Sequence, residues 1–358
     1  MRRALRETTD ESCRTGPSAM KLLVLGGTRF LGRHVVDAAL ARGDDVTIFT
    51  RGRLPVPWSG EGRVTALVGD RDPRIEPGLK ALERGAWDAV IDCSGYVPRV
   101  VEAGARILAQ RVSRYVFVSS MSVYAKTDRP NLDETTPVAT LPDPATEAVM
   151  EQYGALKAAC EAAIERLLGS RATQVRPGLI VGPFDATDRF GYWVARFVHP
   201  HLLGDRPPRA VVPGPRERPL QFIDGRDLAQ WIVDIAARDV GGVFNACSGA
   251  WQFRMGEFVN ALVAASPAPP RPAWIDDEEL VANGVTPWVG LPLWLPPSEP
   301  DSGGFMTMDC SRAERAGLSI RPLAATIRDT ARWLLERDNA GAWKQVLTAE
   351  AERAILAM

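Results

Sequence analysis

The clearest chemical spacing in this sequence joins a tyrosine and a lysine, Tyr153 and Lys157. The apolar pattern over Glu147–Leu168 predicts a helix, and residues four apart lie on the same face of a helix. The phenol and the ammonium can therefore contact the same bound molecule. We expect the ammonium to lower the pKa of the phenol, because a nearby positive charge favours the phenolate. Such a tyrosine can act as a general acid or base near neutral pH, although this spacing also occurs by chance on amphipathic helix surfaces.

A second group of hydroxyls, Ser119–Tyr124, directly follows the apolar run Tyr115–Val118. The run predicts a buried strand, which places these hydroxyls at the carboxyl edge of a sheet. Ser120 precedes Tyr153 by 33 residues, and we select it over the other serines of the segment as the group that hydrogen-bonds a substrate oxygen. The predicted catalytic residues are Ser120, Tyr153 and Lys157.

A glycine-rich loop, Gly26–Gly32, follows the first apolar run, Leu22–Leu25. A buried strand, a tight turn and a helix that opens at Phe30 together form a site for the pyrophosphate of a dinucleotide. Backbone N–H groups at the helix start face the anion, and the helix dipole favours negative charge there. The loop alone is a modest signal, because short loops before helices are common. Its position after the first strand is what favours dinucleotide binding.

Two arginines near this loop favour the phosphorylated form of the cofactor. Arg29 stands where the usual pattern has its middle glycine, and Arg51 follows the second expected strand, where an acidic residue normally holds the ribose 2′-OH of NAD. Two guanidinium groups can clamp a 2′-phosphate, so NADP is predicted, with NAD as the alternative. Two solvated loop arginines would be the plain explanation. Asp70, after the third strand, is expected to accept a hydrogen bond from the adenine amino group, or else to be an exposed turn aspartate.

Taken together, these motifs resemble an extended or atypical short-chain dehydrogenase/reductase of the NAD-dependent epimerase/dehydratase family, over about residues 20–340. Arg176–Gly178 and Phe222–Ala229 add to the resemblance, the latter being similar to a junction whose acidic turn caps a helix. The resemblance implies a Ser–Tyr–Lys triad and hydride transfer at a hydroxyl or carbonyl carbon of a small, sugar-like substrate, by an oxidoreductase or epimerase. The predicted cofactor-binding residues are Gly26, Gly27, Thr28, Arg29, Phe30, Leu31, Gly32, Arg51, Asp70, Ser94, Lys157 and Pro177.

Three departures from the family pattern qualify this reading. Arg29 replaces a glycine, as it does in an atypical subgroup that includes RNA-associated chloroplast proteins. Met121 and Ser122 stand where sugar-nucleotide dehydratases carry an Asp-Glu pair for proton removal and water loss, so dehydration is disfavoured. Val100–Gly104 replaces the region in which many relatives have a proton-relay asparagine. A non-catalytic NADP-binding sensor and an RNA-associated protein are the alternative functions.

Composition favours an ordinary enzyme of a reducing compartment such as the cytoplasm. The net charge of −1 gives no reason to expect a nucleic-acid or membrane partner, so a small-molecule substrate is the expected partner and a homodimer is the assembly to test. The five cysteines are scattered without a Cys-x-x-Cys pair, which argues against a disulfide scaffold or a zinc site. No metal is predicted.

Further residues could contact the substrate, although core packing or a solvated loop is the alternative for each of them. They are Tyr96, Trp193, Trp288, Trp294, Arg216 and Arg218.

The elements that must position these residues alternate between strand and helix up to residue 180, which predicts a Rossmann-like, doubly wound parallel sheet of the α/β class with a smaller C-terminal substrate lobe. The expected strands are Leu22–Leu25, Val46–Phe49, Val64–Val68, Ala89–Ile91, Tyr115–Val118 and Thr173–Arg176. The expected helices are Leu31–Arg42, Val100–Gln110, Glu147–Leu168, Asp227–Ala237, Met255–Ala265 and Leu323–Arg337, of which the last is expected to close the ordered chain. The expected divisions are a disordered extension without the apolar stretch of a signal peptide (1–19), a cofactor domain (20–180), a substrate lobe interleaved with the sheet (181–340) and a tail (341–358).

Overall fold

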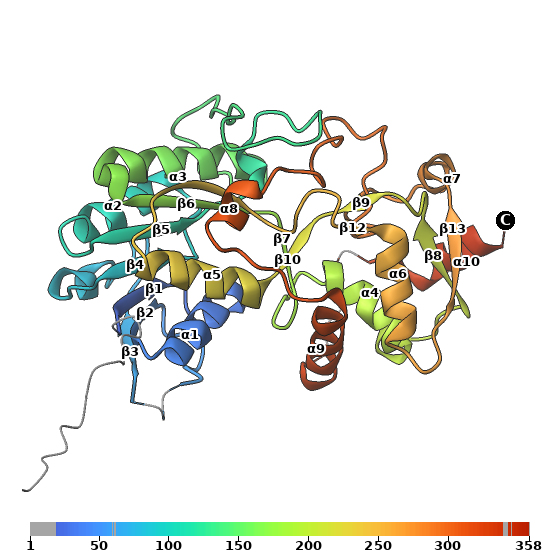
Figure 1. Cartoon of the computed structure of the whole chain (residues 1–358), viewed down its shortest axis with the longest axis horizontal. Coiled ribbons are helices and arrows are strands. Elements are labelled where there is room, and N and C mark those ends of the chain that lie inside the picture. The colour runs from blue at the N-terminus through green and yellow to red at the C-terminus, as the bar shows by residue number, and fades with distance from the viewer. Residues whose placement is uncertain (1–18, 59, 61, 339–342, 345, 358) are drawn as a thin grey trace, which may run out of the picture.

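A computed structural model gives the fold of this chain and describes residues 19–357 apart from 59, 61, 339–342 and 345 (Figure 1). The expected extension therefore lies outside the described residues, except for Ala19. Within these ranges, none of the helices combines the length and the apolar character that crossing a bilayer needs.

The centre of the molecule is a sheet of seven strands in the order β11-β6-β5-β4-β1-β2-β3, and each neighbouring pair is parallel. Its strands are β1 (Lys21–Leu25), β2 (Asp45–Thr50), β3 (Val64–Val68), β4 (Ala89–Asp92), β5 (Arg114–Val118), β6 (Ala172–Pro177) and β11 (Gly242–Ala246). The order reverses between β1 and β4, as in a doubly wound fold. The predicted Rossmann-like parallel sheet is confirmed, and the six expected strands lie within one residue of their predicted bounds.

Helices cover both faces of this sheet. Helices α1 (Phe30–Arg42) and α5 (Gly225–Ala237) pack together below it in Figure 1, and α2 (Pro98–Leu108) and α3 (Tyr153–Leu168) pack together above it. Two apolar cores result, with Leu22 and Val24 of β1 in the lower one and Leu23 and Leu25 in the upper one. Because β1 is buried on both faces, its sequence is a continuous apolar run rather than an alternating one.

Helix α3 begins at Tyr153, six residues later than its predicted start at Glu147. The Glu147 carboxylate instead accepts a hydrogen bond from Nε of Arg99 at 2.8 Å, outside any helix. Gly154 lies so close to the chain at Ser122 that an added Cβ would be 1.9 Å from its carbonyl oxygen. Tertiary contacts thus override the helical pattern before Tyr153. Tyr153 and Lys157 remain one turn apart, at the beginning of the helix rather than in its middle.

A second lobe lies beside the sheet, to the right in Figure 1, with an apolar core of its own that includes Trp193 and Trp294. Its helices are α4 (Arg189–Val198), α6 (Met255–Ala264), α7 (Asp277–Ala282), α9 (Leu323–Glu336) and α10 (Ala349–Leu356). Its short strands are β7 (Leu179–Val181), β8 (Arg209–Pro213), β9 (Pro219–Leu220), β10 (Phe222–Asp224), β12 (Phe253–Arg254) and β13 (Arg271–Ile275), and α8 (Ser311–Arg315) lies near β11.

The expectation that ordered structure ends with the helix at Leu323–Arg337 is wrong, because α10 follows it. Glu352 of α10 is fully buried and accepts a hydrogen bond from Nε of Arg196 at 3.0 Å. The carboxylate also accepts from the backbone N–H of Val211 at 3.1 Å. A buried ion pair of this kind binds α10 to α4 and β8. A short helix whose anchor is one buried charge gives no periodic apolar signal of its own.

Candidate active site

A cleft of about 860 Å³ opens where the strands of the central sheet end. Its lining includes residues that directly follow β1, β2, β3, β4, β5 and β6. Parallel α/β sheets bind ligands at this edge. The cleft brings together all of the predicted catalytic and cofactor-binding residues except Gly27. Gly27 packs under the loop instead, where an added Cβ would lie 2.7 Å from Cγ2 of Ile48.

The glycine turn has the shape that a bound dinucleotide requires. Gly26 has a φ of +91°, and an added Cβ would lie 2.8 Å from Cβ of Ser94. At Gly32 an added Cβ would lie 2.0 Å from the carbonyl oxygen of Gly26, so a side chain at either position would collide with the turn. Both glycines line the cleft. The backbone there can therefore approach a bound pyrophosphate closely.

The start of α1 is free of side-chain caps. Arg29 is the N-cap residue with extended backbone, and its side chain makes no cap hydrogen bond. Phe30, Leu31 and Gly32 of the first turn line the cleft. Their backbone N–H groups lack partners within the helix, so they and the helix dipole offer an anion site. These residues fit the pyrophosphate of a dinucleotide.

Positive side chains line the cleft beside this turn. Arg29, Arg51 and Arg53 all contribute to it, and none of them forms an ion pair with a described residue. Asp70 is the single carboxylate among the described lining residues, and its Oδ1 accepts the backbone N–H of Asp72 at 2.9 Å. No acid follows β2, where NAD-binding proteins of this fold hold the ribose 2′-OH.

A buried polar network lies at the end of β4, next to the cleft. The fully buried Asp92 accepts two hydrogen bonds from Arg71, Nη1 to Oδ1 at 2.6 Å and Nη2 to Oδ2 at 2.7 Å. The Tyr115 hydroxyl donates to Oδ2 of Asp92 at 2.8 Å, and Nη1 of Arg71 also donates to Oγ of Ser94 at 2.9 Å. Burial alone would raise the pKa of Asp92, but the Arg71 charge and its hydrogen bonds hold it below its usual value. The network fixes Ser94 against the glycine turn.

The three predicted catalytic side chains lie in the same cleft. Ser120 follows β5, and its Oγ accepts the backbone N–H of Ser122 at 3.1 Å. Tyr153 opens α3, and Lys157 lies one turn further along. The Lys157 ammonium is buried and donates to the carbonyl oxygens of Gly95 and Val118, at 2.7 Å each. Lys157 thereby joins the ends of β4 and β5 beneath the cleft.

The expectation that Lys157 lowers the pKa of Tyr153 is wrong for this structure. Burial raises the pKa of Tyr153, and the influences in the opposite direction come from the Ser120 hydroxyl and the charge of Arg189. Burial also lowers the pKa of Lys157 to about 8. The spacing of the two residues is visible in the sequence, but the depth at which they are buried is not.

The buried lysine predicts a pH-dependent stability. Its pKa of about 8 in the folded chain lies below the value of about 10.4 of an unfolded lysine. Between these values only the unfolded chain holds the proton, so the contribution of Lys157 to the free energy of unfolding rises with pH. The neutral amine still has N–H donors for both carbonyl oxygens. We expect the free energy of unfolding of the wild type to rise relative to that of Lys157→Met from about pH 8 to about pH 10. Urea unfolding at several pH values measures this difference. A difference between the two proteins that does not change with pH would contradict the prediction.

Several residues of the cleft were not predicted as site residues. Arg71 lies in the turn after β3, and Thr187, Arg189 and Phe305 lie in segments without a sequence motif. Among the further candidates, Tyr96 and Trp288 line the cleft. The others do not: Trp193 and Trp294 are fully buried in the second lobe, Arg218 forms an ion pair with Asp277, and Arg216 stacks on Trp274.

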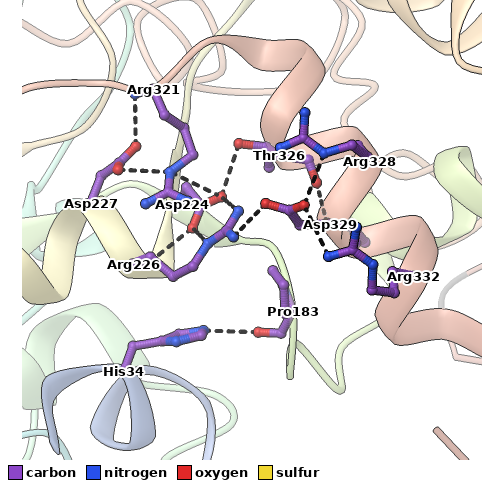
Figure 2. A network of polar contacts seen from close by, with 11 residues as sticks. His34, Pro183, Asp224, Arg226, Asp227, Arg321, Thr326, Arg328, Asp329 and Arg332 are labelled. Carbon is purple, nitrogen blue, oxygen red and sulfur yellow. Dashed lines mark hydrogen bonds and ion pairs between the residues drawn. The ribbon is translucent and has the colours of Figure 1, made fainter. Parts of the chain in front are cut away.

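The predicted capping junction at Phe222–Ala229 is confirmed, and it lies in the polar network of Figure 2. Oδ1 of Asp224 accepts the backbone N–H of Arg226 at 2.9 Å and so caps α5. Nη1 of Arg226 donates to Asp329 of α9 at 2.6 Å. His34 of α1 is hydrogen-bonded through Nε2 to the carbonyl oxygen of Pro183 at 3.0 Å (Figure 2). These contacts join α1, α5, α9 and the segment after β7.

Comparison with known proteins agrees with this geometry. The family model of the NAD dependent epimerase/dehydratase family matches residues 22–247. Two curated relatives are chloroplast stem-loop binding protein of 41 kDa b from Arabidopsis thaliana, 28% identical over 183 residues, and sterol demethylase protein B from Methylococcus capsulatus, 30% identical over 237 residues. The alignments cover 47% and 62% of this chain. The chain spans less than half of the first relative, 44%, and 67% of the second.

Solved structures show the same fold. A putative epimerase from Burkholderia cenocepacia is 22% identical with a TM-score of 0.64, over 90% of this chain and 100% of that one. The enzyme WbmH from Bordetella bronchiseptica, solved in complex with NAD+, is 18% identical with a TM-score of 0.63, over 89% of this chain and 99% of that one. The family match spans the glycine turn, the Ser–Tyr–Lys residues and all seven strands of the central sheet. This chain therefore belongs to the NAD dependent epimerase/dehydratase family.

Proposed function

We propose that this protein is an NADP-dependent oxidoreductase or epimerase that acts at a hydroxyl or carbonyl carbon of a small substrate. The observation that carries the proposal is the placement of Ser120 and Tyr153 in one cleft with the glycine turn and the start of α1. When bound, the nicotinamide supplies or accepts the hydride. This chain's own residues then have to bind the substrate oxygen and move its proton.

Each catalytic residue has a role that its surroundings support. The Tyr153 phenol gives a proton to the substrate carbonyl oxygen, and its raised pKa keeps it protonated for this step at neutral pH. In the reverse direction the phenolate, which forms only at alkaline pH, takes the proton from the hydroxyl. Ser120 lies in the same cleft and orients that oxygen. An ammonium has three N–H donors, and Lys157 uses two of them on Gly95 and Val118. Its third donor is available for a ribose hydroxyl of the cofactor.

Dehydration is not part of the proposal. Loss of water requires a group that removes a proton from the carbon next to the reacting one, and carboxylates do this in sugar-nucleotide dehydratases. Next to Ser120 the chain has the buried, apolar Met121 and then Ser122. Among the described lining residues the one carboxylate, Asp70, follows β3 on the far side of β4 and β1 from Ser120. Oxidation, reduction or epimerisation needs no such group.

NADP is proposed over NAD because of the arginines beside the glycine turn. A 2′-phosphate carries negative charge, and a guanidinium can bind it through two parallel N–H groups. We expect Arg29→Ala and Arg51→Ala each to weaken NADPH binding about tenfold or more, with little change for NADH, because one charge-assisted hydrogen bond contributes about 1.5–3 kcal/mol. Fluorescence titrations measure both affinities. Arg106→Ala, at an exposed residue of α2, is the matched control. Equal losses for NADPH and NADH would show that the arginines do not select the phosphate.

The experiment that tests the function combines binding with turnover. Purified protein is titrated with NADPH and NADH, and it is then incubated with NADP+ or NADPH and a panel of alcohols and carbonyl compounds. Absorbance at 340 nm follows net oxidation or reduction, and chiral chromatography of the recovered compounds follows epimerisation, which leaves the cofactor unchanged. The proposal expects tight NADPH binding and turnover of at least one compound, which Tyr153→Phe lowers by about 10²–10⁴-fold. Tight NADPH binding without any turnover would favour a non-catalytic sensor.

A further inference from the structure

The second lobe contributes one charged side chain to the described lining of the cleft, that of Arg189. Arg189 is the first residue of α4 and is half-buried. Burial raises the pKa of the Tyr153 phenol, and the Arg189 charge opposes that rise. Arg189 and Tyr153 also line the same cleft. An anion bound by Arg189 would therefore share that cleft with the reacting carbon.

Arg189 differs from the buried arginines of this chain because it lacks a carboxylate within ion-pair distance among the described residues. Examples are Arg71 with Asp92, Arg176 with Glu161 and Arg196 with Glu352, at 2.6, 2.7 and 3.0 Å. Burial lowers the pKa of Arg189, which reflects the energetic penalty of its charge. A half-buried cation that lines a cleft and lacks a direct ion pair with a described residue favours an anionic ligand.

The Arg189 side chain is held in place by two neighbours. Its Nε donates to Oγ1 of Thr187 at 3.1 Å. Oγ1 of Thr187 in turn donates to Oδ1 of Asp185 at 2.7 Å, and the backbone N–H of Thr187 donates to the same oxygen at 2.9 Å. Asp185 is buried, with 2% of its surface exposed. This chain of contacts uses Nε of Arg189 and leaves its two terminal NH2 groups without a hydrogen bond to the described residues.

One aromatic ring lies near the guanidinium, and three more line the same cleft. Its central carbon lies 5.6 Å from the centre of the Trp288 ring, and Phe305 meets Trp288 edge to face at 5.6 Å. On the sheet side, the Tyr96 and Tyr153 rings lie 6.4 Å apart. All four rings line the cleft. Such walls suit a substrate whose remaining body is apolar or planar.

We propose that Arg189 binds an oxyanion of the substrate, a carboxylate or a phosphate, next to the carbon that reacts at Tyr153. The substrate is then a hydroxy or oxo acid whose body contacts Trp288 and Phe305. The two terminal NH2 groups of Arg189 supply the paired donors that such an oxyanion accepts. Thr187 is a positioning residue for Arg189. The proposal rests on the proposed function, because it takes Tyr153 as the marker of the reacting carbon.

Matched ligand pairs test the proposal. Calorimetric titrations of the full chain, with and without NADP+, use lactate, mandelate and 3-hydroxy-3-phenylpropionate, each beside its primary amide. A further probe, 2-hydroxy-2-phenylethyl phosphate, distinguishes a phosphate from a carboxylate. We expect at least one acid to bind about tenfold or more tightly than its matching amide, or the phosphate to bind about tenfold or more tightly than 1-phenylethane-1,2-diol, its uncharged counterpart, because the uncharged ligands cannot accept charge-assisted hydrogen bonds from Arg189. The amide keeps the shape of the acid and removes its charge.

Variants assign this preference to Arg189. Arg189→Gln is expected to abolish the preference for the acid, Arg189→Lys to keep part of it, and Thr187→Val to reduce it without changing the affinity for the amide. Arg216→Gln is the matched control, because Arg216 stacks on Trp274 outside the cleft. Arg189→Gln should bind NADPH as the wild type does, which also shows that it folds.

Three outcomes would overturn the proposal. The acids and the phosphate could bind no better than their uncharged counterparts, or Arg189→Gln could keep the preference. Alternatively, Arg189→Gln could weaken NADPH binding as much as it weakens acid binding, which would assign the guanidinium to the phosphates of the cofactor. Failure of the proposed function is recognised separately, by absent NADPH binding or by turnover that survives Tyr153→Phe.

Discussion

Arg71→Met is expected to lower the free energy of unfolding by about 3–5 kcal/mol, because it leaves a buried carboxylate without its cation. Asp92 is fully buried, and both of its oxygens accept hydrogen bonds from Arg71, at 2.6 and 2.7 Å. The variant would retain the hydrogen bond from the Tyr115 hydroxyl, which cannot neutralise a full charge. Urea unfolding of the cofactor-free protein, followed by circular dichroism, measures the loss.

The pH dependence of this loss identifies its cause. The ion pair holds the pKa of Asp92 below its usual value, so its stabilisation is present above the unfolded pKa of about 3.9 and disappears as the pH falls further. The difference between wild type and Arg71→Met should therefore shrink in acid. The double variant Arg71→Met/Asp92→Asn removes both charges and keeps an amide for Tyr115, so it should recover part of the loss. A loss that is the same in both variants would indicate packing rather than charge.

The inner strands of the central sheet could be predicted from sequence because they are buried on both faces, whereas the edge strand β3 is partly exposed. Leu22, Leu23, Val24 and Leu25 of β1 are fully buried, so burial on both sides appears in the sequence as a continuous apolar run. The seventh strand, β11, gave no such signal. Its Asn245 is buried but polar, and its Nδ2 donates to the carbonyl oxygens of Leu132 and Asp309 at 3.3 and 3.0 Å. A strand whose polar side chain is satisfied by distant loops cannot be recognised from local hydrophobicity.

In the candidate site, too, some residues could be proposed from the sequence and others could not. The glycine turn, Ser120 and Tyr153 with Lys157 could be proposed from sequence because each motif follows a strand or lies on one helix face, and because together they resemble a known family. Arg71 and Asp92 are 21 residues apart and meet only because of the way the chain folds around β4. Arg189 reaches the cleft from the second lobe and has no local pattern at all. Buried charges and contacts between lobes therefore have to be taken from the structure.

The expectation for the pKa of Tyr153 failed for a related physical reason. A charge four residues away on a helix lowers the pKa of a phenol only if its attraction for the phenolate exceeds the cost of burying that charged form. Here the Lys157 ammonium instead donates to the carbonyl oxygens of Gly95 and Val118, and burial dominates for both groups. The correction favours a protonated phenol at neutral pH, and with it proton donation to a carbonyl.

Tyr153→Phe is expected to lower kcat by about 10²–10⁴-fold for the panel compound that turns over, because it removes the general acid/base. NADPH affinity should be unchanged, since phenylalanine keeps the ring and loses the hydroxyl alone. Tyr192→Phe is the matched control: Tyr192 is fully buried in α4 outside the cleft, and its hydroxyl has no hydrogen-bond partner among the described residues. That variant should keep both stability and turnover.

The pH profile separates a chemical role of the phenol from a structural one. Burial raises the pKa of Tyr153 above its ordinary value of 10, so the phenol remains a proton donor through neutral pH and loses its proton only in strong base. Carbonyl reduction by the wild type should therefore decline at alkaline pH, and the residual activity of Tyr153→Phe should lack that decline. Ser120→Ala should lower kcat and keep the alkaline limb, because the phenol is still present. A Tyr153→Phe variant with wild-type kcat would show that the proton moves through another group.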